Sequence, residues 1–373
     1  MPVATYLPKT AFSADLRRAV DHHFASTGKP QRDVAGMYAK TAIILAWLAG
    51  SYGLLLFGVS TPLQAGMAAV SLGLAMAAVG FNVQHDGSHG AYSRRPWVNR
   101  AMALTLDLLG GTAYFWHFKH NIAHHTHPNV VGQDDDISLG ILGRVAPSQK
   151  WYPHHRFQLI YIWLLYAVFA LQWQLGGELR NLVSKRWVGG TAVPAPRGKE
   201  LVIFWVGKLV FLSLAFGLPL VFHPLSHVLG AYAITVVVLG LVLALVFQSA
   251  HVSDACAFRS PTSAGHLVPR PWAEHQVETT VDFGRGNRLL GWYLGGLNFQ
   301  IEHHLFPRIC HLHYRELAPI VESVCRAHGV RYFAHPSFRA ALRAHVKQLR
   351  DMSKRPAVTP GPAEQEALLP RPT

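Results

Sequence analysis

The sequence predicts an all-α integral membrane protein with about four transmembrane helices in two hairpins, interfacial helices and a histidine-rich cap on the cytoplasmic side. Half of the 373 residues are hydrophobic and only 14% are charged, against roughly 25% charged residues in an average soluble domain. The apolar residues gather in runs long enough to cross a bilayer. Three histidine clusters lie between these runs and are the best candidates for a functional site.

The balance of charge is strongly basic, with a formal net charge of +14. A basic chain can bind nucleic acid, an anionic membrane surface or an acidic substrate carrier. The apolar runs favour the membrane over nucleic acid, because Lys and Arg gather in the cytoplasmic loops of membrane proteins. Cys256, Cys310 and Cys325 form no C-x-x-C pair, so we expect neither a structural disulfide nor a thiolate metal site.

The chain is expected to form one catalytic unit, residues 36–335, between two smaller segments. In the segment 1–35, apolar residues recur every four positions from Phe12 to Phe24, which predicts an amphipathic helix that stops at Gly28. This helix could lie on the membrane or pack on the protein. The segment 336–373 is expected to form a basic helix followed by a disordered tail. No secretory signal peptide is expected, because the N-terminus lacks a suitable apolar run.

Four apolar runs are expected to cross the membrane. They lie at about 41–59, 62–83, 201–222 and 227–250, and at 1.5 Å per residue each spans roughly 30 Å. The turns at 60–62 and 223–227 contain no Lys or Arg, whereas the stretches 84–156 and 176–200 are basic. The positive-inside rule therefore places both basic stretches, and with them the three histidine clusters, on the cytoplasmic side.

Two further apolar stretches are predicted not to cross. Residues 101–116 are short and interrupted by Asp107, which suggests an interfacial or re-entrant segment. Residues 157–175 must return to the side that they left, so we expect them to lie in the interface. Lys208 falls inside the third span but only about two helical turns from its cytoplasmic end, so we expect it to snorkel to the surface.

The three clusters contribute seven imidazoles: His85 and His89, then His120, His124 and His125, then His303 and His304. The first two clusters each hold a pair four residues apart, which lies on one helix face and could bind one metal. His125 of the second cluster could reach toward a second metal. One of the adjacent histidines 303 and 304 in the third cluster could do the same. Because an ion takes only about four to six such ligands, two ions are the simplest explanation.

The type of ligand narrows the chemistry. Imidazole suits zinc, copper, iron and nickel, and histidine-rich sites with open positions suit oxygen chemistry at iron or copper better than zinc hydrolysis. His117 and His127 flank the second cluster without fitting its spacing and are expected to have no direct role.

These clusters resemble a known pattern. H-D-G-S-H at 85–89, H-N-I-A-H-H at 120–125 and Q-I-E-H-H at 300–304 resemble the three histidine boxes of membrane fatty acid desaturases, in the same order. The resemblance extends over roughly residues 35–330. It implies a di-iron centre, O₂ as co-substrate and the seven clustered histidines as catalytic iron ligands.

The resemblance also implies further site residues. His251 stands just past the last span, where the family supplies another iron ligand, and His275 is a less favoured candidate for that place. Four polar residues are expected to orient the imidazoles or line the cofactor site through hydrogen bonds. They are Asp86, Asn129, Asp134 and Asp136, and the acidic run 134–136 is equally compatible with a solvated loop.

Gln300, in the third box, occurs in the family's front-end enzymes, which insert a double bond between an existing one and the carboxyl end. The chain carries no H-P-G-G motif of a fused cytochrome b5. The resemblance therefore implies a separate electron donor, of the ferredoxin or cytochrome b5 type. The implied reaction is the O₂-dependent introduction of a cis double bond into an acyl chain carried by CoA, a carrier protein or a lipid.

Other functions remain open from the sequence. The same scaffold could hydroxylate a lipid or sphingolipid, because the two reactions differ only after the first hydrogen is removed. A histidine-rich metal transporter is a distant alternative, since it would need ligands inside the spans. We expect the site to face the cytoplasm, at the inner membrane if the protein is bacterial, and we expect no nucleic acid partner. Chain length and double-bond position do not follow from the sequence.

Overall fold

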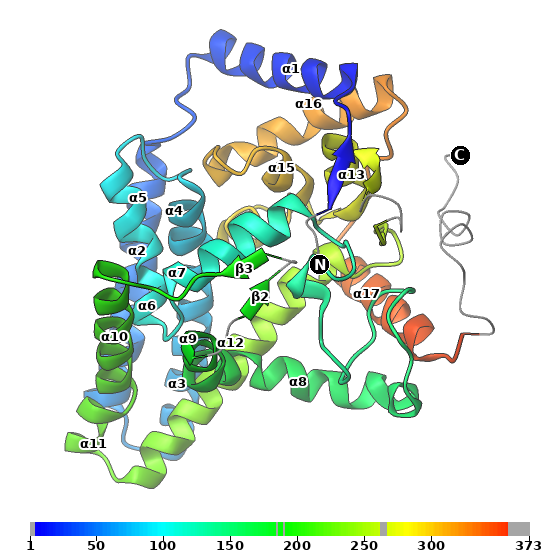
Figure 1. The fold of residues 1–373 in the computed structure, drawn as a ribbon. Helices are drawn as coiled ribbons and strands as arrows, with labels where there is room; N and C mark the ends of the chain where they lie inside the picture. The colour runs from blue at the N-terminus through cyan, green and yellow to red at the C-terminus, as the bar shows by residue number, and fades with distance from the viewer. Residues whose placement is uncertain (1–3, 184–185, 189–190, 262–266, 357–373) are drawn as a thin grey trace.

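The computed structural model describes residues 4–183, 186–188, 191–261 and 267–356, and these residues are mostly helical (Figure 1). Four long helices form the apolar part: α2 (Ala35–Gly53), α3 (Pro62–Ala78), α10 (Lys199–Leu212) and α12 (Leu225–His251). Small residues bring them close together. A Cβ added at Gly73 of α3 would lie 2.7 Å from the carbonyl oxygen of Thr235 in α12, a close approach that is typical of membrane helix packing.

The four long helices pair into the two predicted hairpins. α2 continues into the π-helical η1 (Leu54–Gly58), and Thr61 caps α3 with a capping box that includes Gln64. The second hairpin runs through α10, η7 (Ser213–Gly217) and α11 (Leu218–Phe222) into α12. The two turns lie together, because His223 Nε2 donates to the carbonyl of Leu56 at 2.9 Å. The turns at 60–62 and 223–227, which contain no Lys or Arg, thus lie at the same end of the long helices.

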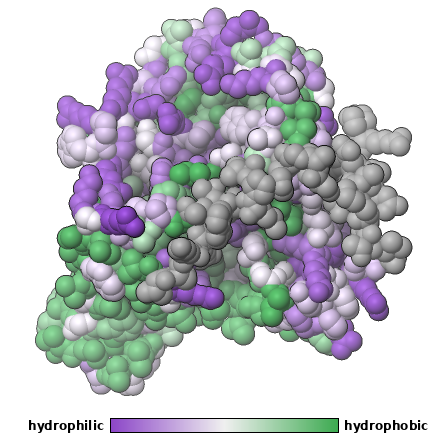
Figure 2. Space-filling model, viewed as in Figure 1, coloured by the Kyte–Doolittle hydropathy of each residue, from purple (hydrophilic) through white to green (hydrophobic). Residues whose placement is uncertain are grey.

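The outer surface of this part is apolar. Figure 2 shows hydrophobic residues gathered over the lower helices of the view and hydrophilic residues over the upper part. Val202, Leu209 and Val221, on α10 and α11, are each more than half exposed. A soluble protein would not leave so broad a surface of this kind in water. The chain is therefore an integral membrane protein.

Among the described residues, five helical stretches are long and apolar enough to cross a membrane, one more than the four predicted spans. The fifth, Pro153–Leu182, comprises η5 (Pro153–Phe157), α8 (Gln158–Gln172), η6 (Trp173–Gly177) and most of α9 (Glu178–Val183). Figure 1 draws α8 across the direction of α2, α3 and α10. That orientation agrees with the expectation that this stretch lies along the interface.

The prediction for Lys208 is wrong. Its side chain is buried, and Nζ donates to Glu178 at 2.8 Å and to the carbonyl of Gly110 at 2.5 Å. Glu178 in turn accepts from the backbone N–H of Thr112 at 2.9 Å. A carboxylate inside the protein gives the ammonium a closer partner than the membrane surface, so the side chain points inward.

Short helices build the cap above the long ones. They are η2 (Val79–Gln84), α4 (His85–His89), α5 (Pro96–Ala103), α6 (Thr105–Leu108), α7 (Ala113–Trp116), η3 (His117–His124), η4 (Asp135–Ile137), α13 (Trp272–Thr279), α14 (Arg288–Tyr293), α15 (Gln300–Leu305), η8 (His311–His313), α16 (Tyr314–Ala327) and α17 (Phe338–Ser353). The predicted interfacial stretch 101–116 is α6, α7 and parts of their neighbours rather than one helix.

The N-terminal helix packs on the protein. α1 (Ala11–Thr27) buries Phe12, Leu16, Val20 and Phe24 in hydrophobic clusters shared with α16 and α15. It ends where predicted, because Gly28 takes the left-handed conformation with φ 64° and caps the helix. The sequence left open whether this helix lies on the membrane or packs on the protein, and the structure shows that it packs on the cap.

The described residues also form three two-stranded sheets, which tie distant segments together. They pair β1 (Thr5–Leu7) with β4 (Leu267–Pro271) in parallel, β2 (Arg186–Val188) with β3 (Thr191–Val193) antiparallel, and β5 (Asp282–Phe283) with β6 (Ala334–His335) in parallel. The predicted basic helix is α17, which packs against α8 and α12. The tail predicted to be disordered, from 357 onward, lies outside the described residues.

Candidate metal centre

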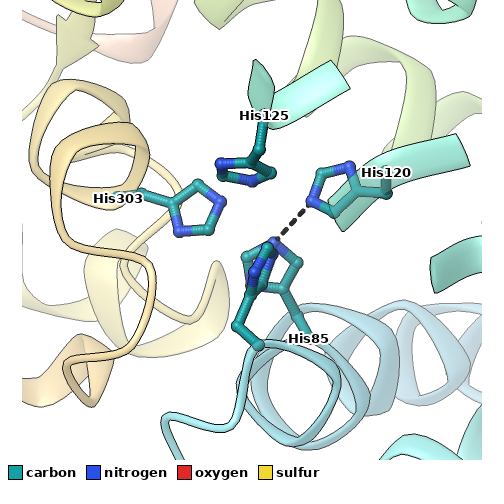
Figure 3. Close-up of side chains that lie close together, drawn as sticks. His85, His120, His125 and His303 are labelled. Carbon is teal, nitrogen blue, oxygen red and sulfur yellow. Dashed lines mark hydrogen bonds between the residues drawn. The ribbon is translucent and has the colours of Figure 1, made fainter. Parts of the chain in front are cut away.

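All three histidine clusters meet at one buried place in the cap. α4, η3 with the residue that follows it, and α15 present His85, His120, His125 and His303 toward one another (Figure 3). His85 Nε2 and His120 Nε2 lie 3.2 Å apart, and the rings of His85 and His303 have centroids 4.4 Å apart. Segments more than 170 residues apart in sequence thus share one site.

The imidazoles divide into two groups. In each group the nitrogen atoms that could bind a metal all lie within 4.8 Å of one another. The first group holds His85, His89, His120, His125 and His303, and the second holds His124, His251 and His304. Ring contacts join the groups, because His125 stacks on His304 with centroids 4.4 Å apart. The arrangement offers two neighbouring metal positions rather than one.

The second cluster divides differently from the expectation that His120 and His124 pair on one face. η3 is a π-helix, with hydrogen bonds between residues i and i+5, so each turn is wider than that of an α-helix. His120 and His125 therefore lie together in the first group, while His124 turns toward the second. The spacing argument assumed an α-helix, which this segment does not form. His120 and His124 still come together in a smaller group with Asp136.

Burial favours the metal-binding form of the imidazoles. It lowers the pKa of His120 to about 4, and burial together with neighbouring imidazoles holds the pKa values of His125, His303 and His304 well below the usual range. Neutral imidazole is the form that binds a metal. For His124, burial also lowers the pKa, but the carboxylates of Asp134 and Asp136 outweigh it and raise the pKa above its ordinary value.

The buried nitrogens fit a metal. The Nε2 atoms of His89, His125, His303 and His304 are buried, and within the described residues they have no hydrogen-bond partner. An unpartnered buried polar atom costs free energy, so such a concentration calls for a missing partner. A metal ion in each group, bound by neutral imidazoles, would supply it.

Several hydrogen bonds fix which nitrogen faces the centre. His304 Nδ1 donates to the amide oxygen of Gln276 at 2.9 Å, which leaves Nε2 free to bind. His303 Nδ1 lies 3.3 Å from the hydroxyl of Tyr314. Sequence reasoning missed Gln276 and Tyr314, because neither stands at a helical spacing from a histidine cluster. Such partners set the tautomer and orientation of a metal-binding imidazole.

The polar residues expected around the centre have different contacts. His124 Nδ1 lies 3.1 Å from both carboxylate oxygens of Asp134, and Asp136 pairs with Lys119 at 2.9 Å while lying 3.5 Å from His124. Within the residues that the structure describes, the Asp86 carboxylate makes no hydrogen bond to a clustered histidine. It accepts from His311 Nδ1 at 2.9 Å.

Asn129 connects loops. It has a left-handed φ of 57°, and its side-chain amide donates to the carbonyls of His251, Ala257 and Thr279. It therefore fixes the backbone that carries His251 instead of touching an imidazole. His275 is not brought to the centre, because its Nε2 donates to the carbonyl of Pro128 at 2.8 Å.

Gln300 lies against His251, with its amide nitrogen placed 2.9 Å from His251 Nε2. Within the described residues, His251 Nδ1 has no hydrogen-bond partner. The Gln300 contact therefore involves Nε2 and leaves Nδ1 without a hydrogen bond. The sequence pointed to both residues but not to their contact.

The chain matches known proteins along most of its length. A family model described as "Fatty acid desaturase" matches residues 60–336. The chain is 37% identical over 358 residues to the sn-1 linoleoyl-lipid 6-desaturase of Arthrospira platensis, covering 94% of this chain and 95% of the relative. It is 36% identical over 351 residues to the protein of the same name from Synechocystis sp., covering 94% and 97%.

A third relative is longer than this chain. The acyl-lipid (8-3)-desaturase of Physcomitrium patens is 36% identical over 341 residues, which cover 90% of this chain and 70% of the relative.

Proposed function

This chain belongs to the fatty acid desaturase family and is thus an oxidoreductase, and we propose that it is an acyl-lipid desaturase of the front-end type. It introduces a cis double bond into a lipid-bound acyl chain, on the carboxyl side of an existing double bond. The similarity to two linoleoyl-lipid 6-desaturases along 94% of the chain supports this, as does Gln300 in the third box. The observation that carries the proposal is the pair of buried imidazole groups with unpartnered nitrogens.

We infer that the two groups hold two iron ions. Five imidazoles would hold the first ion, and His124, His251 and His304 the second, with Asp136 near both His120 and His124. When bound, iron with O₂ supplies the oxidising power for an unactivated C–H bond, which no acid or base in the chain can attack. Five imidazoles around the first position exceed the three protein ligands that are usual for a catalytic zinc ion.

The residues of the chain position and shield the centre. Gln276 and Tyr314 hold His304 and His303 in fixed orientations, and Gln300 does the same for His251. His120, His124, His303 and His304 are each at most 2% exposed, so these imidazoles are shielded from bulk water. A buried site keeps a reactive centre away from side reactions with solvent.

An apolar cavity between the spans fits the acyl chain. It has a volume of about 560 Å³ and is lined mainly by α2, α3 and α12, with Met76, Leu109 and Phe211 among its walls. Met76 and Leu109 belong to the same hydrophobic cluster as Phe81. Phe247 packs against this cluster, and its ring centroid lies 6.5 Å from that of His120. A fixed channel of this kind would place chosen carbons at the metals.

Electrons must come from a separate protein, which we propose to be a ferredoxin or a free cytochrome b5. The basic stretches flanking the histidine clusters support a site on the cytoplasmic face, at the inner membrane if the protein is bacterial.

The proposal is tested by expression in a host that is supplied with linoleic acid and has no such enzyme. Mass spectrometric mapping of lipid acyl chains should reveal a new double bond at carbon 6. His303→Ala should abolish the product and lower bound iron while the protein still inserts. The exposed His22→Ala serves as the matched control and should leave both unchanged.

Other outcomes would identify the alternatives. Hydroxylated chains in place of new double bonds would make the protein a hydroxylase. Metal uptake without any lipid product would favour a transporter. Undiminished product from His303→Ala would contradict the assignment of the centre.

A further inference from the structure

A second cavity, of about 390 Å³, opens in the cap directly beside the histidine centre. Four arginines line it, namely Arg32, Arg94, Arg100 and Arg308, together with Ser88, His89, Asn99 and His117. We propose that this cavity, the arginine cavity, binds the phosphate of a glycerophospholipid headgroup. The inference rests on the proposed function, because it names the lipid class that carries the acyl chain.

The charges in the arginine cavity are only partly compensated. Arg100 pairs with Glu200 at 2.6 Å, and the Nε of Arg94 lies 4.0 Å from Asp33. Within the part of the chain that the structure describes, neither Arg32 nor Arg308 has a carboxylate at ion-pair distance; Arg32 Nε donates to the carbonyl of Arg308 at 3.1 Å. Two guanidinium groups thus remain to attract an anion. The planar fork of donors on each guanidinium matches phosphate oxygens.

The arginine cavity shares a wall with the metal centre. His89 lines the cavity and also belongs to the first imidazole group. An anion bound here would therefore lie close to the reacting carbons. In a glycerophospholipid, only the glycerol carbons separate the acyl ester from the phosphate. In an acyl-CoA, the first phosphate lies beyond the whole pantetheine arm, too far along the molecule to occupy this place while the front end of the chain is at the metals.

The position relative to the membrane also favours a lipid. α5 contributes Pro96, Asn99 and Arg100 to the arginine cavity, and its Trp97 is 67% exposed. Exposed tryptophan on a membrane protein is typical of the interfacial layer, at the level of the lipid headgroups. A lipid that enters from the membrane would bring its phosphate to this height without leaving the bilayer.

An acidic electron donor is the other partner that a basic surface could serve. The arginine cavity is concave and reaches inward to His89, so it suits a small anion better than the convex surface of a protein. Docking of a donor is nevertheless a distinct outcome of the experiment below.

The test uses the purified full-length protein in detergent and measures binding without turnover. Dilinoleoyl phosphatidylglycerol is compared with dilinoleoylglycerol, which has the same chains but no phosphate, and with linoleoyl-CoA. The wild type should bind the phospholipid at least about tenfold more tightly than dilinoleoylglycerol, as expected for charge-assisted hydrogen bonds. The preference should weaken as salt is raised.

The decisive variant is Arg32→Gln with Arg308→Gln, which should lose the preference. The matched control removes the same charge from two exposed arginines that do not line the arginine cavity, Arg95→Gln with Arg315→Gln, and should keep the preference. Size-exclusion profiles and iron content establish that both proteins are folded. A cavity variant that is folded and retains the preference, or a wild type that prefers linoleoyl-CoA, would overturn the inference.

Turnover measurements separate the remaining outcomes. The cavity variant should show a raised KM for the phospholipid, an unchanged KM for the uncharged lipid and an unchanged requirement for the electron donor. A raised donor requirement with both lipids would instead make the arginine cavity a donor site and contradict the inference. Failure to desaturate either lipid, with the phosphate preference intact, would contradict the proposed function alone.

Discussion

At the scale of single residues, the side chain of Gln276 governs how His304 faces the centre. Its amide oxygen accepts from His304 Nδ1, and its amide nitrogen donates to the carbonyl of His125 at 3.2 Å. Gln276→Ala should lower iron affinity and activity by about 10- to 100-fold, the usual effect of losing such a partner. Iron content after dialysis and initial rates measure this.

A conservative variant distinguishes orientation from packing. Gln276→Glu keeps an oxygen that can accept from His304, so it should retain more iron than Gln276→Ala. Equal iron loss in the two variants would mean that the amide oxygen has no orienting role.

Individual residues also mark the limit of what the sequence predicts. The sequence identified the clustered histidines, because boxes of this kind are local patterns. It could not identify Gln276 or Tyr314, since their partners, His304 and His303, are reached only through the fold. The orientation of the Lys208 side chain was predicted wrongly for the same reason. Its partner Glu178 is 30 residues away, and nothing in the local sequence indicates the pairing.

At the scale of elements, π-helical turns arrange the ligands. η2 precedes His85, and η3 carries the second cluster, so that His120 and His125 share a side. The pattern of apolar residues predicted the long helices and their hairpins correctly, because burial and lipid contact impose it directly. It could not predict the π-helices, whose extra residue per turn depends on the tertiary contacts of the cap.

The docking of α17 should depend on pH through His345. Burial lowers the pKa of His345 to about 4, and the neutral ring fits its contacts: Nδ1 donates to the carbonyl of Val252 at 2.7 Å and Nε2 accepts from Tyr166 at 3.0 Å. The unfolded chain binds a proton at His345 more readily than the folded protein does. The neutral ring therefore contributes roughly 3 kcal/mol at most to the stability of the fold. This contribution is present at neutral pH and declines as the pH falls from about 6.5 to about 4.

Thermal unfolding in detergent at pH 7 and pH 5 checks this. Between pH 7 and pH 5, the melting temperature of the wild type should fall further than that of His345→Gln, because glutamine cannot gain the charge. The exposed His22→Ala should behave like the wild type. Equal pH dependence in the wild type and His345→Gln would rule out the role of His345.

The contact between α10 and α9 is a buried ion pair within the membrane part. Lys208→Met would leave the carboxylate of Glu178 buried and unpaired, at a cost of roughly 3–5 kcal/mol. Lys208→Met combined with Glu178→Gln removes both charges and should recover most of the loss. Melting temperatures of the two variants measure the difference, and equal destabilisation would contradict the account.

At the scale of the whole molecule, both turns without basic residues lie at the same end and the histidine centre lies in the cap. The account therefore predicts that Ser226→Cys and Lys150→Cys react from opposite sides of the membrane. Cys256, Cys310 and Cys325 are buried and should contribute little background. Labelling with an impermeant thiol reagent in oriented vesicles checks this, and labelling of both positions from one side would contradict the topology.

The whole fold also explains why one site emerges from three separated clusters. The hairpins return the chain to the cap, where α4, η3, α15 and the end of α12 meet. The sequence implied this convergence, because the clusters stand at the ends of predicted spans. It could not show how eight imidazoles divide between two positions, since that division depends on the relative rotation of helices.

The most direct measurement is anomalous diffraction at the iron edge from crystals of the purified protein. The account predicts two iron peaks, one among His85, His89, His120, His125 and His303 and one among His124, His251 and His304. A single peak, or iron bound at the separate group of Asp86, Cys310 and His311, would contradict it.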